Sequence, residues 1–325
     1  MKNILWIFAM AFLLFSCAEK KTETAVTNSE TDTLISAEEI LKNLVLGKNQ
    51  VIKNKTVTGV LDFTKALKED QKLNMSIAYL DGELNFINCK FLDDVSAFCK
   101  NRENNSVFVC VFNKTVNFLE CKFLKGVNFF QSRFNDRFNF ELCNVKGSAE
   151  FTATEFMTGV SFHSSEFQGG CSFISGTFLG AANFFKTLYK KELIIQNVKF
   201  FRNLTFCDSH FYGYFELSLS DVASLADFSN AKFSDRVVFS NSGFWKGAKF
   251  SGCEFSKEFA FEKNRSFSDL NFSFVYFKNS VKVNDNVVLG GIIQEKLAGE
   301  KGFKWEISYN KTISLSDTKF FNINK

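Results

Sequence analysis

Large apolar residues recur along the chain at spacings that alternate between five and six residues. Stepping by eleven from Phe118 to Phe272, every position holds Phe, Ile or Leu, and a second column from Phe123 to Phe255 never holds a charge. The position two residues before each column member is also restricted in residue type, and a polar residue stands between the two. If the column member is called position i, this pattern is typical of short strands in which positions i and i−2 both face the interior. The 3.6-residue period of a helix is absent.

The position two residues before each member of the second column is nearly always small. This small position is occupied by Cys121, Ser132, Cys143, Thr154, Ser165, Gly176, Thr187, Val198, Ser209, Ser220, Ala231, Ser242 and Cys253. Small residues there leave room for the large side chains that follow them. The pattern therefore predicts a solenoid of short strands around a narrow interior.

Short units of a small, a polar and a central aromatic residue carry a family resemblance. Examples are "VNF" at 127–129, "AEF" at 149–151, "ANF" at 182–184 and "ADF" at 226–228. They resemble the pentapeptide-repeat family over roughly residues 80–283. The resemblance implies an all-β fold, a right-handed quadrilateral parallel β-helix.

The alternation of five and six residues changes the expected size of the coil. Four sides make about 22 residues rather than the family's 20, so residues 22 apart should stack about 4.7–4.9 Å apart. From Val107 to Val283 this gives about eight coils and a rod of the order of 40 Å. A coil cannot bury its apolar face alone, and each buried Phe contributes roughly 1.5–3 kcal/mol gross, which explains the 44 Phe of this 325-residue chain. The complete absence of Pro suits a backbone ladder that needs every donor.

The N-terminus has the pattern of an export signal. One Lys, an apolar run from Ile4 to Phe15 and then "LFSC" at 14–17 resemble the signal peptide and lipobox of bacterial lipoproteins, which implies cleavage before Cys17 and its lipidation. An ordinary secretory signal and an uncleaved anchor are the alternatives. Residues 17–35 are polar and predict a flexible tether.

The remaining divisions follow from local signals. Ser36 and Glu39 form a capping box before an apolar helical face, and Gly47 ends it. The expected parts are a signal peptide at 1–16, the lipidated tether at 17–35, a capping helix at 36–50, the β-helix at 51–283 with a loop insertion at 93–106, and a C-terminal cap at 284–325.

Candidate chemistry is scarce. Six of the nine Cys, namely Cys89, Cys110, Cys121, Cys143, Cys171 and Cys253, occupy position i−2 and are expected to be buried, which leaves Cys99 and Cys207 accessible. His163 and His210 are too far apart to share a metal. "SNAK" at 229–232 would need a helix to act as a Ser-x-x-Lys nucleophile, and here it falls on a strand. We therefore expect no enzyme activity, no cofactor and no metal.

Charge limits the choice of partner. The chain has a formal charge of +4, and the pairs Arg133 with Glu155, Lys199 with Asp221, and Lys232 with Glu254 are each 22 apart, so opposite charges should neighbour each other on adjacent coils. Some pentapeptide-repeat proteins mimic DNA through an acidic rod and protect topoisomerases. The mixed charges here disfavour that remote alternative, and no basic stripe predicts nucleic-acid binding.

One outward column is apolar. Met157, Leu179, Phe201, Ala223 and Trp245 are spaced by 22 and should form a continuous stripe. Such patches usually mark an interaction site, for a protein partner or for self-association. Two other interpretations stay open: the segment 287–293 covers the stripe, or the aromatic rings bind a carbohydrate.

These features together predict a non-enzymatic scaffold or protein-interaction module of the bacterial cell envelope, held on the membrane by a lipid anchor and facing the periplasm or the cell surface. A carbohydrate-binding or polysaccharide-acting β-helix with a lateral aromatic face is the alternative.

The lipid anchor can be tested directly. Cys17→Ala should abolish incorporation of labelled fatty acid into the expressed protein, because the lipobox thiol is the attachment site. Incorporation that persists in this variant would contradict the anchor.

Overall fold

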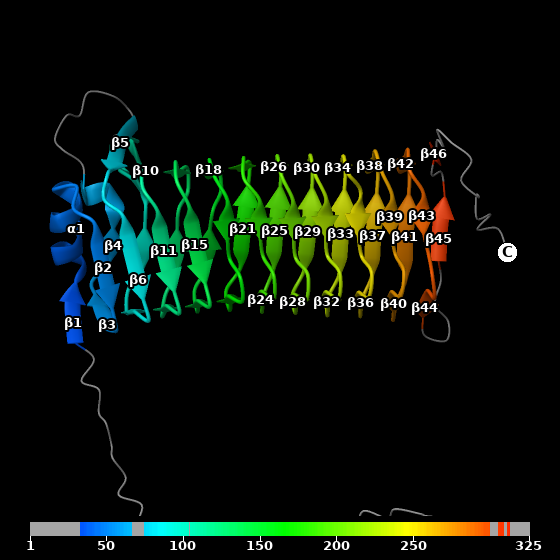
Figure 1. Ribbon diagram of the computed structural model, residues 1–325, viewed down its shortest axis with the longest axis horizontal. Coiled ribbons are helices and arrows are strands. Elements are labelled where there is room, and N and C mark those ends of the chain that lie inside the picture. Colours follow the sequence, from blue (N-terminus) through cyan, green and yellow to red (C-terminus); the bar gives the residue numbers. More distant parts are fainter. Residues whose placement is uncertain (1–32, 67–74, 104, 300–304, 309–310, 313–325) are drawn as a thin grey trace, which may run out of the picture. The chain divides into compact units, whose positions relative to one another are not determined.

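The computed structural model describes residues 33–66, 75–103, 105–299, 305–308 and 311–312. Cys17 and the predicted signal peptide lie outside these residues. The chain divides at Thr31, and the second unit, Asp32–Lys325, contains all the described residues. This unit is a four-sided parallel β-solenoid (Figure 1).

Each turn of the chain adds one strand to each of four sheets, here called sheets I to IV in the order in which the chain visits them. Sheet I contains β1 (Thr33–Ser36), β3 (Lys55–Thr58), β7 (Lys90–Phe91), β12 (Lys122–Phe123), β16 (Asn144–Val145), β20 (Glu166–Phe167), β24 (Leu188–Tyr189), β28 (His210–Phe211), β32 (Lys232–Phe233), β36 (Glu254–Phe255), β40 (Tyr276–Phe277) and β44 (Ala298–Gly299). Sheet II contains β4 (Leu61–Asp62), β8 (Val95–Ser96), β13 (Val127–Asn128), β17 (Ala149–Glu150), β21 (Cys171–Ile174), β25 (Leu193–Gln196), β29 (Phe215–Ser218), β33 (Val237–Ser240), β37 (Phe259–Glu262), β41 (Val281–Asn284) and β45 (Trp305–Ser308).

Sheets III and IV complete the square, so sheet III lies opposite sheet I. Sheet III contains β5 (Met75–Leu80), β10 (Val107–Phe112), β14 (Arg133–Phe134), β18 (Glu155–Phe156), β22 (Thr177–Phe178), β26 (Lys199–Phe200), β30 (Asp221–Val222), β34 (Gly243–Phe244), β38 (Arg265–Ser266), β42 (Val287–Val288) and β46 (Lys311–Thr312), with β9 (Phe98–Lys100) beside β10. Sheet IV contains β2 (Gln50–Lys53), β6 (Leu84–Ile87), β11 (Val116–Leu119), β15 (Phe138–Glu141), β19 (Val160–Ser161), β23 (Ala182–Asn183), β27 (Leu204–Thr205), β31 (Ala226–Asp227), β35 (Ala248–Lys249), β39 (Leu270–Asn271) and β43 (Ile292–Ile293).

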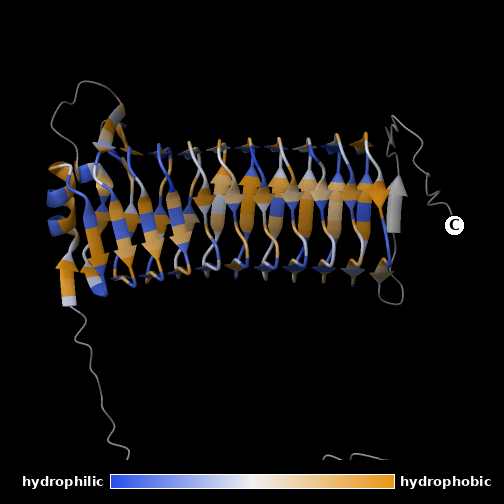
Figure 2. Cartoon of the chain, in the orientation of Figure 1, coloured by the Kyte–Doolittle hydropathy of each residue, from blue (hydrophilic) through white to orange (hydrophobic). Residues whose placement is uncertain are grey.

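The register confirms the predicted coil of 22 residues. Phe134 pairs with Phe156, Phe156 with Phe178, and Phe178 with Phe200 along sheet III. With eleven or twelve strands to a sheet and about 4.8 Å between strands, the solenoid is roughly 50 Å long. Figure 2 shows how hydrophobic and hydrophilic residues alternate along its coils.

Aromatic rings fill the interior in columns parallel to the long axis. In sheet IV, Phe184 stacks on Phe162 at 4.8 Å between ring centroids and on Phe206 at 4.5 Å. In sheet III, Phe156 stacks on Phe178 in the same way, with 4.7 Å between ring centroids. These rings are fully or almost fully buried, so each coil depends on the coils above and below it for its core.

The small position supplies hydrogen-bond donors as well as space. Thr154 Oγ1 donates to the carbonyl of Phe129 at 2.7 Å, and Ser165 Oγ donates to that of Phe140 at 2.7 Å. The thiol of Cys143 donates in the same way to Phe118 at 3.3 Å. In each case the acceptor lies 25 residues back, one coil away. Where the small position holds such a donor, its side chain can satisfy a buried carbonyl of the neighbouring coil as well as leave space for the rings.

One residue in every eleven turns the chain in the left-handed conformation. Between Glu120 and Lys296 these positive-φ residues recur without a break, at φ from 50° to 72°, and Gly252 is the single glycine in the series. Leu142, Leu219 and Phe274 also adopt this conformation. At some of these positions the left-handed residue is the third residue of a tight turn, as when the amide of Ser132 donates to the carbonyl of Phe129 at 3.0 Å around Gln131. After Leu142 and Leu219 the next amide instead donates to a serine hydroxyl of the following coil, Cys143 to Ser165 at 3.0 Å and Ser220 to Ser242 at 3.2 Å.

The N-terminal end carries the predicted capping helix. Helix α1 (Ala37–Val45) begins after Ser36, whose hydroxyl accepts from the amide of Glu39 at 3.1 Å, so the predicted cap is confirmed. The helix buries Ile40 and Leu44 against the first coil and the 3-10 helix η1 (Phe63–Ala66) (Figure 1). It takes the place of strands in sheets II and III, because β1 precedes it in sheet I and β2 follows it in sheet IV.

Two predicted boundaries near the N-terminus differ from the structure. Residues 33–35, assigned to the tether, belong to β1, which pairs with β3. The helix, expected to fill 36–50, ends at Val45, and Gln50 already begins β2. In both places the chain joins a neighbouring coil, which extends the solenoid beyond the residues whose apolar pattern marks it.

The predicted loop insertion at 93–106 is also shorter in the structure. Val95 and Ser96 stay in the coil as β8, and Phe98–Lys100 forms β9, antiparallel to β10. Backbone pairing holds these segments together with side-chain packing, since Val95 is fully buried and the Phe98 ring lies 4.6 Å from that of Phe130.

A further difference is at the C-terminus. The coil does not end at Asn284, since β42, β43 and β44 pair in parallel with β38, β39 and β40 at the same 22-residue register. The Phe of the columns give way there to Val and Ile, which fill the same positions with less volume. The parallel pairing of the strands therefore extends farther along the chain than the repeating Phe.

Left-handed turns at bulky residues provide a stability test. Leu219→Asn should raise the free energy of unfolding by about 1 kcal/mol, because a left-handed residue costs roughly 1–2 kcal/mol and Asn tolerates it better than Leu. The reverse change two turns on, Asn241→Leu, should lower it by a similar amount. Urea unfolding measures both; no difference in either variant would contradict the assigned turns.

Candidate functional site

The five predicted stripe residues form one column. Each directly follows a sheet III strand, at the corner where the chain turns toward sheet IV. The amide of Phe201 donates to the carbonyl of Phe178 at 2.9 Å, that of Ala223 to Phe200 at 2.8 Å and that of Trp245 to Val222 at 2.9 Å. These bonds fix the column on consecutive coils. Met157 and Leu179 are partly exposed, whereas Phe201, Ala223 and Trp245 lie farther out on the surface.

The stripe is longer than the sequence analysis predicted. Phe267 and Leu289 continue the same column, and their amides donate to Phe244 at 3.0 Å and to Ser266 at 2.8 Å. Phe201 is 48 % exposed, Trp245 51 % and Phe267 41 %. The 22-residue spacing by itself predicts both residues. Only Leu289 lies beyond the predicted coil boundary at 283, in the segment interpreted as a cap, whereas Phe267 lies inside the predicted β-helix.

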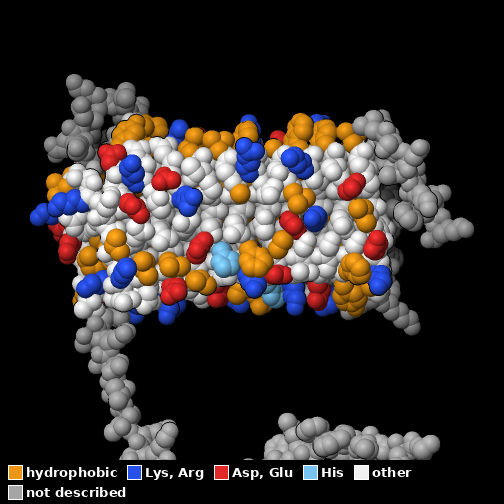
Figure 3. Space-filling view, in the orientation of Figure 1, with side chains coloured by type: hydrophobic (Ala, Val, Ile, Leu, Met, Phe, Trp, Pro, Cys, Tyr) orange, Lys and Arg blue, Asp and Glu red, His pale blue; other side chains and the backbone are white. Residues whose placement is uncertain are grey.

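The segment 287–293 does not cover the stripe. Val287 and Val288 form β42 in sheet III, Ile292 and Ile293 form β43 in sheet IV, and Leu289 between them extends the column. The expectation of an internal cover by this segment is therefore wrong. Its apolar residues belong to a further coil, which the sequence pattern could not distinguish from a covering segment. In Figure 3 hydrophobic side chains gather along the edge above the sheet III strands, with Lys and Arg between them.

Local packing holds the Trp245 indole in the stripe. Its ring stacks on that of Phe267, with 4.5 Å between centroids and 13° between planes. A Cβ atom added at Gly243 would lie 3.7 Å from Trp245 Nε1 and only 2.4 Å from Asp221 Oδ1. Gly243 thus leaves the space over sheet III that the indole and this carboxylate occupy. The Trp245 and Phe267 rings each cover one face of the other, which leaves less open ring surface for a carbohydrate.

Charged residues line the sheet III side of the stripe. Glu155, Lys199, Asp221 and Arg265 stand two residues before stripe members, on the outer face of the strands. The predicted ion pair between Arg133 and Glu155 is present at 3.4 Å. Lys199 and Asp221 are register partners, as predicted, but among the described residues the structure shows no ion pair for them or for Arg265.

The thiols occupy the predicted places. The six Cys of position i−2 are buried, Cys99 is exposed and Cys207 is partly exposed, and these eight described Cys are free thiols. Burial raises the pKa of the Cys253 thiol, which donates to the carbonyl of Phe228 at 3.0 Å. Burial also raises the pKa of Cys207 to about 12, so it is not an activated nucleophile.

Neither His nor the Ser-x-x-Lys match forms a catalytic arrangement. His163 and His210 lie on the outside; the His210 ring contacts Ser234 Oγ at 2.9 Å and stacks on Tyr212. Burial, aided by Lys232 and Lys190, lowers the pKa of His210. Ser229 donates to Asp227 at 2.6 Å in a turn.

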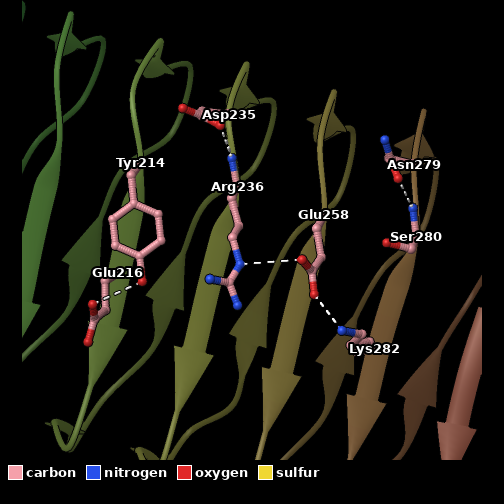
Figure 4. A network of polar contacts seen from close by, with 8 residues as sticks. All are labelled: Tyr214, Glu216, Asp235, Arg236, Glu258, Asn279, Ser280 and Lys282. Carbon is pink, nitrogen blue, oxygen red and sulfur yellow. Dashed lines mark hydrogen bonds and ion pairs between the residues drawn. The ribbon is translucent and has the colours of Figure 1, made fainter.

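A second polar surface crosses sheet II (Figure 4). Glu258 forms ion pairs with Arg236, at 3.4 Å from Nε to Oε2, and with Lys282, at 2.8 Å from Nζ to Oε1, which joins three adjacent coils. On the preceding coil Tyr214 donates to Glu216 at 3.0 Å. Lys282, followed by Arg236, lowers the pKa of Glu258.

Sheet I carries a comparable contact between coils. Glu254 pairs there with Lys278 of the next coil rather than with its predicted neighbour Lys232, although Lys232 and Glu254 are register partners. The ion pairs of sheets I and II tie coils together, and neither set surrounds a cavity or a reactive group.

No group of His, Cys, Asp and Glu in the described part of the chain could hold a metal ion. None of the helices in those same residues is long and apolar enough to span a membrane. Comparison of the sequence and structure with protein-family models, curated proteins and solved structures finds no match. The stripe is thus the candidate site that the described surface offers.

The Glu258 contacts predict a pH dependence. Because the folded pKa of Glu258 is lowered, its ion pairs stabilise the fold above the unfolded pKa of about 4.3 and are lost as the pH falls through the lower folded pKa. Glu258→Gln should reduce the free energy of unfolding by about 0.2–1 kcal/mol near neutral pH. The difference from wild type should vanish in acid, as urea unfolding across pH would show.

Glu120→Gln is the matched control, because Glu120 lies on the surface and makes no ion pair among the described residues. A pH-independent effect of Glu258→Gln would contradict the ionic role of this residue.

Proposed function

We propose that this protein is a lipid-anchored interaction scaffold of the bacterial cell envelope and not an enzyme, and that the apolar stripe is its binding surface. One observation carries the proposal: a continuous column of seven apolar residues, three of them large aromatics exposed by 41–51 %, runs along one corner of a rigid solenoid. Exposed contiguous apolar patches usually mark interaction sites, and repetition of the coil keeps this one straight and preorganised.

Membership of the pentapeptide-repeat family is part of the proposal. It is supported by the small-polar-aromatic units of the sequence and by the four-sided parallel coil in which they fold. The lipid anchor rests on the lipobox-like residues 14–17. A carbohydrate-binding face is the weaker alternative, because Trp245 and Phe267 use one ring face on each other.

The test is a double substitution in the full chain. Phe201→Glu with Trp245→Glu should remove the proteins that co-purify with the chain from detergent-solubilised envelopes, because two charges interrupt the stripe. The melting temperature should stay near that of wild type, since both side chains lie on the surface. Leu142→Glu with Leu219→Glu is the matched control, with similarly exposed apolar residues elsewhere on the solenoid.

Loss of the same proteins in both double variants, or retention of all of them in the stripe variant, would contradict the assignment of the stripe. A collapse of the melting temperature in the stripe variant alone would mean that these rings serve internal packing.

A further inference from the structure

We infer that the stripe pairs with the stripe of a second copy of this chain, with the two rods antiparallel and a perpendicular two-fold axis between them, at the level midway between the coils of Lys199 and Asp221. This inference rests on the proposed function, since it names the partner of the same surface. Two features of the residues along the corner carry it: the sequence of charges on the sheet III side and the sequence of side-chain sizes along the stripe.

The geometry of such a pair is simple. A two-fold axis that lies between the two rods, perpendicular to their length and in the plane of the interface, exchanges the copies and reverses the order of the coils. It leaves the sheet III side of one copy facing the sheet III side of the other. Residues on the facing columns then pair so that their numbers have a constant sum. With the axis between Lys199 and Asp221, Lys199 faces the partner copy's Asp221 and Glu155 faces the partner copy's Arg265.

Every pair of charges on this column is therefore of opposite sign. Thr177 faces Gly243, which introduces neither a charge nor a bulky side chain. On the sheet IV side, Arg202 faces Ser224 and Lys246 faces Gly180, so no like charges meet. Complementary charges of this kind select one arrangement and disfavour others.

Shifting the axis by half a coil in either direction destroys the match. An axis through Lys199 places two lysines opposite each other, and an axis through Asp221 does the same with two aspartates. Both shifts also separate Glu155 from Arg265.

An axis through Thr177 would also pair opposite charges, Glu155 with Lys199 and Arg133 with Asp221, but it sets Trp245 opposite Asn113, outside the stripe. An axis through Gly243 pairs Asp221 with Arg265 but places two copies of Lys246 opposite each other. The charges and the stripe together therefore favour the axis between Lys199 and Asp221.

The stripe itself fits the same register. Phe201 faces the partner copy's Ala223, so the exposed ring of one rod meets the smallest residue of the other, twice about the axis. Farther out, Leu179 faces Trp245 and Met157 faces Phe267. Large side chains opposite small ones allow two ridges to interdigitate, as packed interfaces require.

The charged side chains beside the stripe can form ion pairs with a second copy. Lys199 and Asp221 are register partners within one copy, yet the described residues show no ion pair between them, and none for Arg265. Glu155 has one ion-pair partner there, Arg133 at 3.4 Å, and its side chain remains 48 % exposed. An exposed carboxylate can accept from a second cation.

The interface is narrow. Six stripe residues of each copy, from Met157 to Phe267, face one another, and at about 4.8 Å a rung they make a strip roughly 25 Å long and one or two side chains wide. This is less than the approximately 800 Å² per partner of a standard interface. We therefore expect weak pairing in dilute solution and stronger pairing when lipid anchors concentrate the chains on a membrane. The antiparallel arrangement places the two α1 ends at opposite ends of the pair, so both ends would be tethered.

Two charge-reversal variants test this arrangement: each should lose pairing with itself, and the two should pair with each other. The full chain is made with two different affinity tags, and co-purification of one tag with the other in mild detergent measures pairing. Glu155→Arg places a second guanidinium opposite Arg265 of the partner copy, and Arg265→Glu places a second carboxylate opposite Glu155. Each variant should lose most of the co-purification that wild type shows with itself.

Mixing the two variants should restore pairing. The guanidinium introduced at position 155 of one chain then meets the carboxylate introduced at position 265 of the other, and the native Arg265 and Glu155 that remain form the second opposite pair. These two positions are five coils apart within a chain, so no contact inside one copy can produce this rescue. Lys122→Glu on sheet I, the opposite face, is the control and should pair like wild type. Unchanged melting temperatures verify that the variants fold.

Absence of pairing in wild type, equal pairing in every combination, or failure of the mixed variants to recover would each overturn the antiparallel pair. If wild-type copies do not pair but the stripe double variant still loses another protein, the scaffold function stands and its partner is different. If neither copies nor other proteins depend on the stripe, both proposals fail.

Discussion

Each coil of this solenoid has few large inward side chains, so its core exists only where neighbouring coils cover it from above and below. The stacked rings of Phe162, Phe184 and Phe206 show the consequence, since each ring is completed by residues 22 positions away on both sides. A residue added within one side of a coil would move the rings after it out of their columns. The insertion between Phe86 and Phe118 lies outside the stacked sides, and these two rings still stack at 5.0 Å. The strict register from Arg133 to Val288 is therefore the condition on which the remaining structure depends.

The turns satisfy that condition at a conformational cost. The chain must turn from one flat side of the coil to the next within a few residues. At every second corner it does so through a residue in the left-handed conformation, even where that residue is Leu or Phe. The turn also leaves the carbonyl of the preceding Phe pointing inward. A hydroxyl, thiol or amide from the next coil reaches that carbonyl, as Thr154 and Cys143 do, so most of the buried thiols serve as hydrogen-bond donors and space fillers.

The same register orders the surface, so that side chains of one kind can line up into a binding surface. Any outward position repeats every coil, so a few substitutions of one kind produce a straight column of apolar or charged side chains. The stripe through Phe201 and Trp245 is such a column, and the charges beside it form a second one. A preorganised row of side chains loses little conformational entropy on binding, which suits a scaffold.

Residue types alone predict the coil length, the core residues, the capping helix after Ser36 and the first five members of the stripe, because burial and stacking impose a period that is visible in them. Three features came to light in the folded chain alone: the ladder continues beyond Asn284, the stripe runs on to Phe267 and Leu289 without cover from 287–293, and Lys199 and Asp221 lie side by side with no ion pair among the described residues. The reason is physical: backbone hydrogen bonds between coils accept almost any side chain, so they extend beyond the residues whose pattern announces them. The left-handed corners were equally invisible, because neighbouring coils impose that conformation on residues that do not prefer it.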